Sequence, residues 1–294
     1  MIDLHVHSTM SDGTYTPAQI ATLAKEIGLE AFALTDHDTI SGDEEASAAA
    51  KQYNINFING MEMSLTYDNH QIHVVALGFD KDTAAFKAFY HDLRQKKEAS
   101  IRRVVDYLAS QGLDISLAKV APYKSGDGVD KYAILRYLIA KESAKGDIQF
   151  IWDNYIDPAY RSLKLSLVEN PTAEDALQAI KAAGGVTALA HFHKRIGFAG
   201  YSHEEQEKHI AYLHTMGLDG MEAYYPTYSD DDRAFAHYLI EKYNLMPSGG
   251  TDFHGKNRPS TALGTGINSN MNVPYKFYEN ICQIVKARHN HNEN

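Results

Sequence analysis

Two histidines, His5 and His7, lie two positions apart in a segment that predicts a buried strand from residue 2 to residue 6. Side chains at positions i and i+2 of a strand point to the same side. Two neighbouring imidazoles can therefore chelate one metal ion. Asp12, in the polar turn that follows, can reach a second ion. A surface strand with two solvated histidines has the same pattern, so this motif alone does not decide between the two.

Imidazole and carboxylate side chains also follow most of the other predicted strands. In a barrel of parallel strands the carboxyl ends lie on one face, where active sites are built, so we expect these side chains to converge. His73 is the exception, because it lies near the start of its strand, although it can still point inward. The complete set is His5, His7, Asp12, His37, Glu62, His73, His191, Asp252 and His254.

These potential ligands are too many for one ion. Imidazole and carboxylate without thiolate suit zinc, manganese or iron, whereas magnesium prefers oxygen ligands and ranks lower. Each residue also has a structural alternative, since a strand-end histidine is often only hydrogen-bonded and a strand-end carboxylate often caps a helix. For Asp36 and Asp38, which flank His37, we favour a capping role or a hydrogen bond to a ligand.

The elements that must position these side chains alternate between strand and helix at both ends of the chain. Short apolar runs predict seven strands, at residues 2–6, 31–35, 55–58, 72–79, 186–190, 220–223 and 245–248. Helices separate most of them, and their expected N-caps are Thr16, Ser41, Thr172, Ser202 and Ser229. This alternation predicts an α/β fold of parallel strands joined by right-handed crossovers.

Residues 82–170 interrupt the alternation. Their apolar residues have helical spacing, as in the segment 131–140, and no strand is evident. We interpret this stretch as an inserted helical lobe that caps the substrate site. The barrel itself would then comprise residues 1–81 and 171–294.

Composition excludes several classes of protein. The single cysteine, Cys282, rules out a disulfide framework and a cysteine-based zinc site. The net charge of −10 argues against a surface that grips duplex nucleic acid, but it allows a small anionic substrate held by bound cations. No long apolar run or leader pattern is present, so we expect a soluble, cytoplasmic protein without membrane association.

Taken in order, these motifs resemble the PHP (polymerase and histidinol phosphatase) family, in particular its free-standing phosphoesterases that act on nucleotides. The resemblance rests on six segments and covers both ends of the chain. They are His5-Val6-His7-Ser8 to Ser11-Asp12-Gly13, Thr35-Asp36-His37-Asp38-Thr39, Gly60-Met61-Glu62, the strand that holds His73, Ala190-His191, and Gly250-Thr251-Asp252-Phe253-His254-Gly255.

The resemblance implies a distorted seven-stranded barrel with three divalent metal ions. It assigns His5, His7, Glu62 and Asp252 to the first ion. It lets Glu62 bridge to a second ion held by His73 and His191, and it places the third on Asp12, His37 and His254. Many relatives have proline after the histidine at position 191, whereas this chain has Phe192-His193. Substrate contacts of that loop therefore do not carry over.

Our hypothesis is metal-assisted hydrolysis of a phosphate ester, in which a metal-bridging hydroxide attacks phosphorus in line. The substrate would be a nucleotide, either a nucleoside mono- or bisphosphate. Arg136 and Arg195 are candidate phosphate contacts, and each has a surface salt bridge as its alternative. His193 either touches the substrate or is a solvated loop residue. The general acid is not assigned, and His193 is the only side chain considered for it.

Other functions remain open. A histidinol-phosphate phosphatase would use the same metals in a different pocket. A 5'-3' exonuclease acting on short oligonucleotides would need a groove with several basic or aromatic residues. A metal-dependent amidohydrolase would apply similar chemistry to a carbonyl carbon. A non-catalytic module with a structural metal site is the fourth alternative, and the complete ligand set argues against it.

Overall fold

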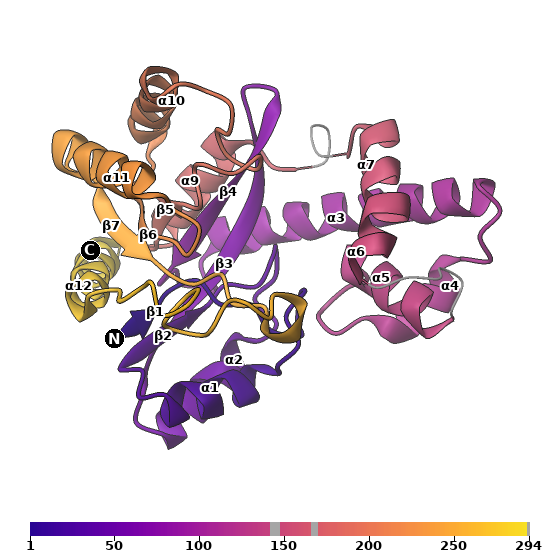
Figure 1. Ribbon diagram of the computed structural model, residues 1–294, viewed down its shortest axis with the longest axis horizontal. Coiled ribbons are helices and arrows are strands. Elements are labelled where there is room, and N and C mark those ends of the chain that lie inside the picture. Colours follow the sequence, from indigo (N-terminus) through magenta and orange to yellow (C-terminus); the bar gives the residue numbers. More distant parts are fainter. Residues whose placement is uncertain (142–147, 166–169, 293–294) are drawn as a thin grey trace.

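The computed structural model describes residues 1–141, 148–165 and 170–292 (Figure 1). Seven strands form one sheet in chain order, which confirms the α/β fold with seven strands. The strands are β1 (Ile2–Asp3), β2 (Ala31–Leu34), β3 (Asn56–Tyr67), β4 (His70–Leu77), β5 (Val186–Leu189), β6 (Gly220–Tyr224) and β7 (Met246–Gly249).

The two ends of the sheet are also connected. The amide of Leu4, just after β1, donates to the carbonyl of Gly249 at the end of β7, at 3.2 Å. Val6 forms a parallel bridge with Phe253. β1 is shorter than the predicted strand of residues 2–6, because residues beyond Asp3 pair only at such isolated positions. Closure of the whole sheet into a barrel stays a prediction.

The expectation of parallel strands is wrong for β4, which runs antiparallel to both β3 and β5. Asp68 and Asn69, with φ angles of 44° and 60°, form the tight turn between β3 and β4. A connection this short can join only antiparallel strands, since a parallel pair needs a long crossover. Antiparallel pairing places His73 opposite Ser64 of β3. The start of β4 therefore lies at the same edge as the carboxyl ends of the parallel strands.

β3 also extends well beyond its predicted end at residue 58. Its buried residues include Met61, Met63 and Leu65, which alternate with Glu62 and Ser64. Alternate residues of a strand face opposite sides of the sheet, so one side of β3 is apolar and the other carries polar groups. Glu62 thus lies within a strand, where neighbours on both sides fix its backbone, and not at the strand end that we expected.

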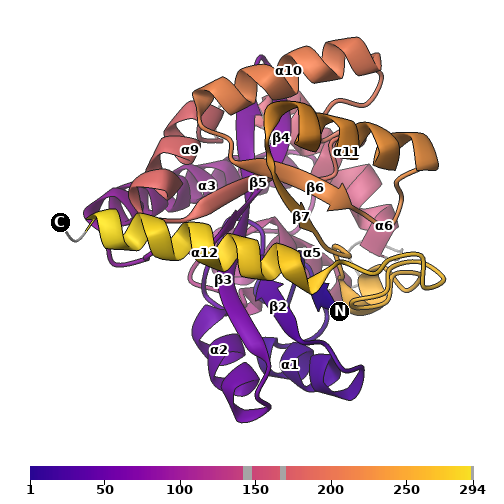
Figure 2. The same ribbon diagram turned by 90° about the vertical axis from the view of Figure 1, so that its left-hand side faces the viewer.

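Helices surround this sheet (Figures 1 and 2). They are α1 (Pro17–Glu26), α2 (Asp43–Gln52), α9 (Ala173–Ala182), α10 (His203–Met216), α11 (Asp230–Tyr243) and α12 (Tyr275–Asn292). The side chains of Thr16, Thr172, Ser202 and Ser229 accept the expected capping hydrogen bonds. These caps fix where each connection from a strand end enters its helix. The predicted cap at Ser41 is wrong, because α2 begins after Gly42, which has no side chain to cap it.

The described residues between 82 and 170 form helices and connections, without a strand. The helices are α3 (Ala84–Ser110), α4 (Leu117–Val120), η1 (Ala121–Tyr123), α5 (Lys131–Ala140), α6 (Ile148–Ile151), η2 (Trp152–Ile156) and α7 (Asp157–Leu163).

Helix α3 runs from the sheet into this helical region (Figure 1). Its first turns, with Phe86 and Leu93, pack into the core around the sheet. Its last turns, from Ile101 to Leu108, belong to a separate apolar cluster with α5 and α7. The domain boundaries at 82 and 170 stay a prediction. None of the described helices has the length and apolarity needed to cross a membrane.

Candidate metal centre

His5 and His7 lie side by side at the edge of the sheet where the parallel strands end, and their Nε2 atoms are 3.1 Å apart. Both side chains are fully buried. Glu62 Oε2 lies 3.3 Å from His5 Nε2 and 3.2 Å from His7 Nε2. Asp252 Oδ1 completes the group at 3.5 and 3.1 Å from the same two nitrogens. Four ligand atoms thus face one point, as the first predicted ion requires.

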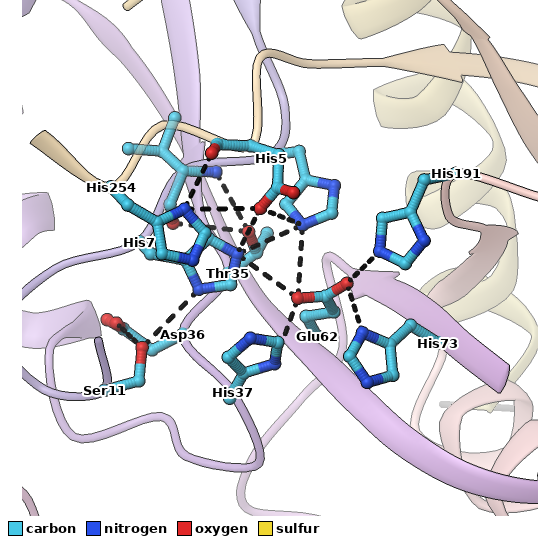
Figure 3. A network of polar contacts seen from close by, with 12 residues as sticks. His5, His7, Ser11, Thr35, Asp36, His37, Glu62, His73, His191 and His254 are labelled. Atoms are coloured by element: carbon cyan, nitrogen blue, oxygen red, sulfur yellow. Dashed lines mark hydrogen bonds and ion pairs between the residues drawn. The ribbon is translucent and has the colours of Figure 1, made fainter. Parts of the chain in front are cut away.

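Glu62 occupies the middle of the centre (Figure 3). While its Oε2 faces the first group, its Oε1 contacts His73 Nδ1 at 2.9 Å and His191 Nε2 at 2.8 Å. His37 Nδ1 approaches Oε2 from another side at 3.0 Å. The two carboxylate oxygens therefore belong to two adjoining groups, which is the arrangement of a bridging ligand.

A third group forms around Asp12. His254 Nε2 lies 3.1 Å from Asp12 Oδ2, and His37 Nε2 lies 3.7 Å from the same oxygen. The rings of His7 and His254 stack with centroids 4.1 Å apart, so the first and third groups are in direct contact. All nine predicted residues are therefore brought together. Their assignment to individual ions stays a prediction.

Several atoms of the centre would be poorly placed without a cation. His37 Nδ1, Glu62 Oε2, His191 Nδ1 and His254 Nε2 are buried, and none of their close contacts with the described residues has the geometry of a hydrogen bond. Buried polar atoms without partners are costly. Four ligands bound at 2.0–2.1 Å in a tetrahedron lie about 3.3–3.4 Å apart, close to the spacing around His5 and His7. The donor set and its spacing therefore fit divalent ions.

The imidazoles and carboxylates of the centre shift one another's pKa values. Burial would raise the pKa of the Glu62 carboxyl, but His73, His37 and His5 hold it well below its usual range. Burial would lower the pKa of His7, but hydrogen bonds to Asp252 and Glu62 raise it to about 9. The carboxylates thus stay ionised near neutral pH and His7 keeps a proton when no cation is present. A bound cation would take the place of that proton.

Glu222 of β6 is a functional residue that the sequence analysis missed. It is buried, its Oε1 lies 2.7 Å from His5 Nδ1, and its Oε2 accepts the backbone amide of His191 at 2.6 Å. A carboxylate on Nδ1 turns Nε2 of the same imidazole toward a metal. A signal for it existed, because an acidic residue inside an apolar strand needs a partner.

The loop after β7 is held against the first strand. Asp3 accepts hydrogen bonds from the amides of Thr251 and Gly264. A side chain on Gly250 would place its Cβ 2.3 Å from the backbone nitrogen of His5, so only glycine allows this approach. Asp252 itself has a φ of 54°, an unfavourable conformation that the surrounding contacts maintain.

The side chains of Asp36 and Asp38 have structural contacts other than the helix cap or ligand hydrogen bond that we favoured. Asp36 accepts hydrogen bonds from the backbone and hydroxyl of Ser8 and from the hydroxyl of Ser11, which orders the turn before Asp12. Asp38 accepts the amide of Ser64 and pairs with Lys97 at 2.8 Å.

A pocket of about 700 Å³ opens over the centre. Arg136 of α5 lines it and donates to the carbonyl oxygens of Tyr123 and Ser11, at 2.8 and 3.2 Å. Arg195 also lines it. His193 is not among the lining residues, and its Nε2 contacts the hydroxyl of Thr227 at 2.8 Å. A role of His193 as substrate contact or general acid therefore gains no support from its position.

Three further basic side chains line the pocket, and the sequence analysis did not single them out. They are Lys131 of α5, Lys194 after β5, and Arg258 after β7. Arg258 forms an ion pair with Asp252, whose Oδ2 also accepts the Tyr225 hydroxyl at 2.6 Å. Nothing in their spacing along the chain distinguishes these cations from surface residues.

Comparison with known proteins places this centre in a family. The sequence model of the PHP domain family matches residues 3–156 of this chain. These residues include six of the nine clustered side chains. The chain belongs to the PHP domain family. A 5'-3' exoribonuclease of Haemophilus influenzae is 31% identical over 253 residues, covering 86% of this chain and 89% of that protein.

Two further proteins match along nearly the whole chain. A 3',5'-nucleoside bisphosphate phosphatase of Chromobacterium violaceum is 29% identical over 266 residues, covering 90% of each chain. A structure from Bifidobacterium adolescentis, named as that of a metal-dependent phosphoesterase, has a TM-score of 0.79 at 23% identity and covers 96% of each chain. Together with the ligand centre, these matches confirm the predicted class, a metal-dependent phosphoric ester hydrolase.

Proposed function

We propose that this chain hydrolyses a phosphate ester of a nucleotide, with a nucleoside mono- or bisphosphate as substrate. The observation that carries the proposal is the placement of three adjoining ligand groups at the base of a pocket with cationic walls. The carboxylates and imidazoles would hold up to three divalent ions, of manganese, iron or zinc. A nucleotide phosphate is an anion that both the ions and the side-chain cations attract.

The residues of the proposed site divide by role. His5, His7, Glu62 and Asp252 would hold one ion, His73, His191 and Glu62 a second, and Asp12, His37 and His254 a third. The ions, when bound, would acidify a water molecule and offset the charge that develops on phosphorus. Arg136 and Arg195 would hold phosphate oxygens that do not face the ions. The general acid for the leaving group is not assigned.

The test is phosphate release by manganese-loaded protein from a panel of a nucleoside monophosphate, a nucleoside bisphosphate, a short oligoribonucleotide and histidinol phosphate. We expect selective turnover of nucleotides, and loss of turnover in Asp252→Asn. Asp106→Asn, an exposed carboxylate on α3, is the matched control and should keep full activity. Release from histidinol phosphate alone would replace the proposal with that phosphatase. Turnover of none of these substrates by metal-loaded protein would leave amidohydrolase activity to be tested.

A second candidate, a 5'-3' exonuclease acting on short oligonucleotides, has support of its own. The pocket wall formed by α5 and η2 combines Lys131 and Arg136 with the rings of Tyr132 and Trp152. Basic and aromatic side chains together are typical of sites for single-stranded nucleic acid. Release of mononucleotides from a 5'-phosphorylated oligoribonucleotide, faster than phosphate release from a mononucleotide, would favour this function.

A further inference from the structure

The two carboxylate oxygens of Asp252 face different neighbours. Oδ1 faces the Nε2 atoms of His5 and His7, at 3.5 and 3.1 Å, and so belongs to the first of the three ligand groups. Oδ2 accepts a hydrogen bond from the Tyr225 hydroxyl at 2.6 Å. Carboxylates bind metal ions through one oxygen or through both. The donors that occupy Oδ2 therefore decide how many ligand atoms Asp252 can offer.

Tyr225 is held in place by its own segment of the chain. It directly follows β6 and precedes Pro226, which favours extended backbone at Tyr225. Its carbonyl accepts the amide of Tyr228 at 3.1 Å, which closes a turn. Its buried ring contacts the rings of His191 and His193, with centroids 5.5 and 5.6 Å away. These contacts fix the position of the hydroxyl without any ligand.

Two basic side chains share Oδ2 of Asp252 with Tyr225, but they face the pocket. Lys194 Nζ lies 3.6 Å from Oδ2, and Arg258 forms an ion pair with the same oxygen. Both basic side chains line the pocket and are partly exposed, so a substrate phosphate can draw them away from Asp252. Tyr225 is not among the lining residues. Its hydroxyl is therefore the donor that stays on Oδ2 when a substrate binds.

We propose that Tyr225 is a positioning residue that keeps Asp252 a one-oxygen ligand of the first ion. The inference rests on the proposed function and on the assignment of Asp252 to that ion. Each further ligand atom from the protein would fill a position that a catalytic ion needs for water or substrate. By holding Oδ2 away from the ligand group, Tyr225 keeps that position open. Lys194 and Arg258 are then free to bind phosphate.

The first test is the visible absorption spectrum of the cobalt(II)-loaded protein, whose intensity falls as the coordination number of the ion rises. Tyr225→Phe removes the hydroxyl and keeps the buried ring. It should lower the absorption, because Oδ2 can then turn to the ion, while the metal content stays that of wild type. Tyr212→Phe, an exposed tyrosine of α10, is the matched control and should change neither.

Steady-state kinetics provide the second test. Tyr225→Phe should lower kcat on the preferred nucleotide about tenfold, as expected for one lost hydrogen bond to a charged group, with KM near that of wild type. Lys194→Met keeps the Tyr225 hydroxyl, so it should raise KM and leave the cobalt spectrum unchanged.

An unchanged cobalt spectrum in Tyr225→Phe, or loss of metal from this variant, would overturn the positioning role. A spectral change of equal size in Lys194→Met would also overturn it, because the lysine would then hold the carboxylate. Failure of wild type to release phosphate from any nucleotide would instead reject the proposed function, while the spectrum would still report on Tyr225. The two failures are therefore distinguishable.

Discussion

The two walls of the main pocket differ in origin and in how fully their charges are neutralised. The wall at the strand ends of the sheet carries the nine clustered imidazoles and carboxylates, most of them buried and in contact with one another. The wall formed by α5 and η2 carries Lys131, Tyr132, Arg136 and Trp152, and its lysine lacks an ion pair among the described residues. The first wall thus offers ligands to cations, and the second offers cationic side chains to an anion.

This difference indicates that one wall serves metal coordination and the other serves the choice of substrate. Glu62 and His73 lie within paired strands, and the other seven clustered residues lie in connections that follow strand ends. The sheet thereby holds these groups at the spacing that metal coordination demands. A helical lobe can vary its side chains without disturbing that spacing. Changes in the sheet wall should therefore abolish turnover, whereas changes in the lobe wall should alter the choice and affinity of substrate.

The largest effect is expected from Glu62→Gln. The amide keeps the shape of the side chain but removes the charge that both carboxylate oxygens contribute. We expect activity to fall by about a thousandfold or more, equivalent to roughly 4 kcal/mol of transition-state stabilisation, together with reduced metal content by elemental analysis. Glu98→Gln, an exposed pair partner on α3, should change neither. Full activity of Glu62→Gln would remove the bridging role.

A smaller loss should follow from Glu222→Gln. This residue does not reach the first ligand group directly but holds His5 through Nδ1 and positions the backbone of His191. Loss of such an orienting carboxylate typically costs about 10- to 100-fold in metal affinity. Competition with a chelator of known affinity measures it, with Glu241→Gln on the exposed side of α11 as control. Unchanged affinity would show that His5 is oriented by packing alone.

Metal binding should also depend on pH. The folded pKa of His7 is about 9, above the usual value of 6.5. Its proton therefore stabilises the metal-free fold fully below pH 6.5, and that contribution is lost as the pH rises through 9. Because a cation must displace this proton, metal affinity should rise up to about tenfold per pH unit between pH 7 and 9. Titration calorimetry in buffers of different ionisation enthalpy should detect proton release, and none should occur if His7 is neutral.

The smallest change is expected in the lobe. Arg136→Lys keeps the positive charge but loses the planar fork that reaches Ser11 and Tyr123. We expect KM to rise about tenfold, in line with one lost charge-assisted hydrogen bond, while kcat stays near that of wild type. Steady-state kinetics on the preferred nucleotide measure both, with the exposed Arg102→Lys as control. A fall in kcat at constant KM would place Arg136 in the chemical step.

The sequence predicted most of this centre because histidine and carboxylate are conspicuous at strand ends. It failed where tertiary pairing decides the outcome. His73 lies near the start of its strand, where a parallel strand would place it away from the other ligands. Because β4 is antiparallel, the start of this strand lies at the edge of the sheet that holds them. Glu62 was assigned to a strand end, although pairing with β4 continues past it. Lys131 was missed because its distinguishing property, a buried ammonium that lies over aromatic rings and forms no ion pair with the described residues, exists only in the folded chain.

The contacts between the first and last strands have a consequence for how the protein is made. Six of the nine clustered residues lie within the first 73 positions, but Asp252 and His254 come late in the chain, and Asp3 secures them through Thr251. Contacts of such long sequence separation form late, because loop closure must precede them. A nascent chain on the ribosome therefore presents an unfinished set of ligands. Tight capture of cations should begin only once Asp252 and His254 have packed against the first strand.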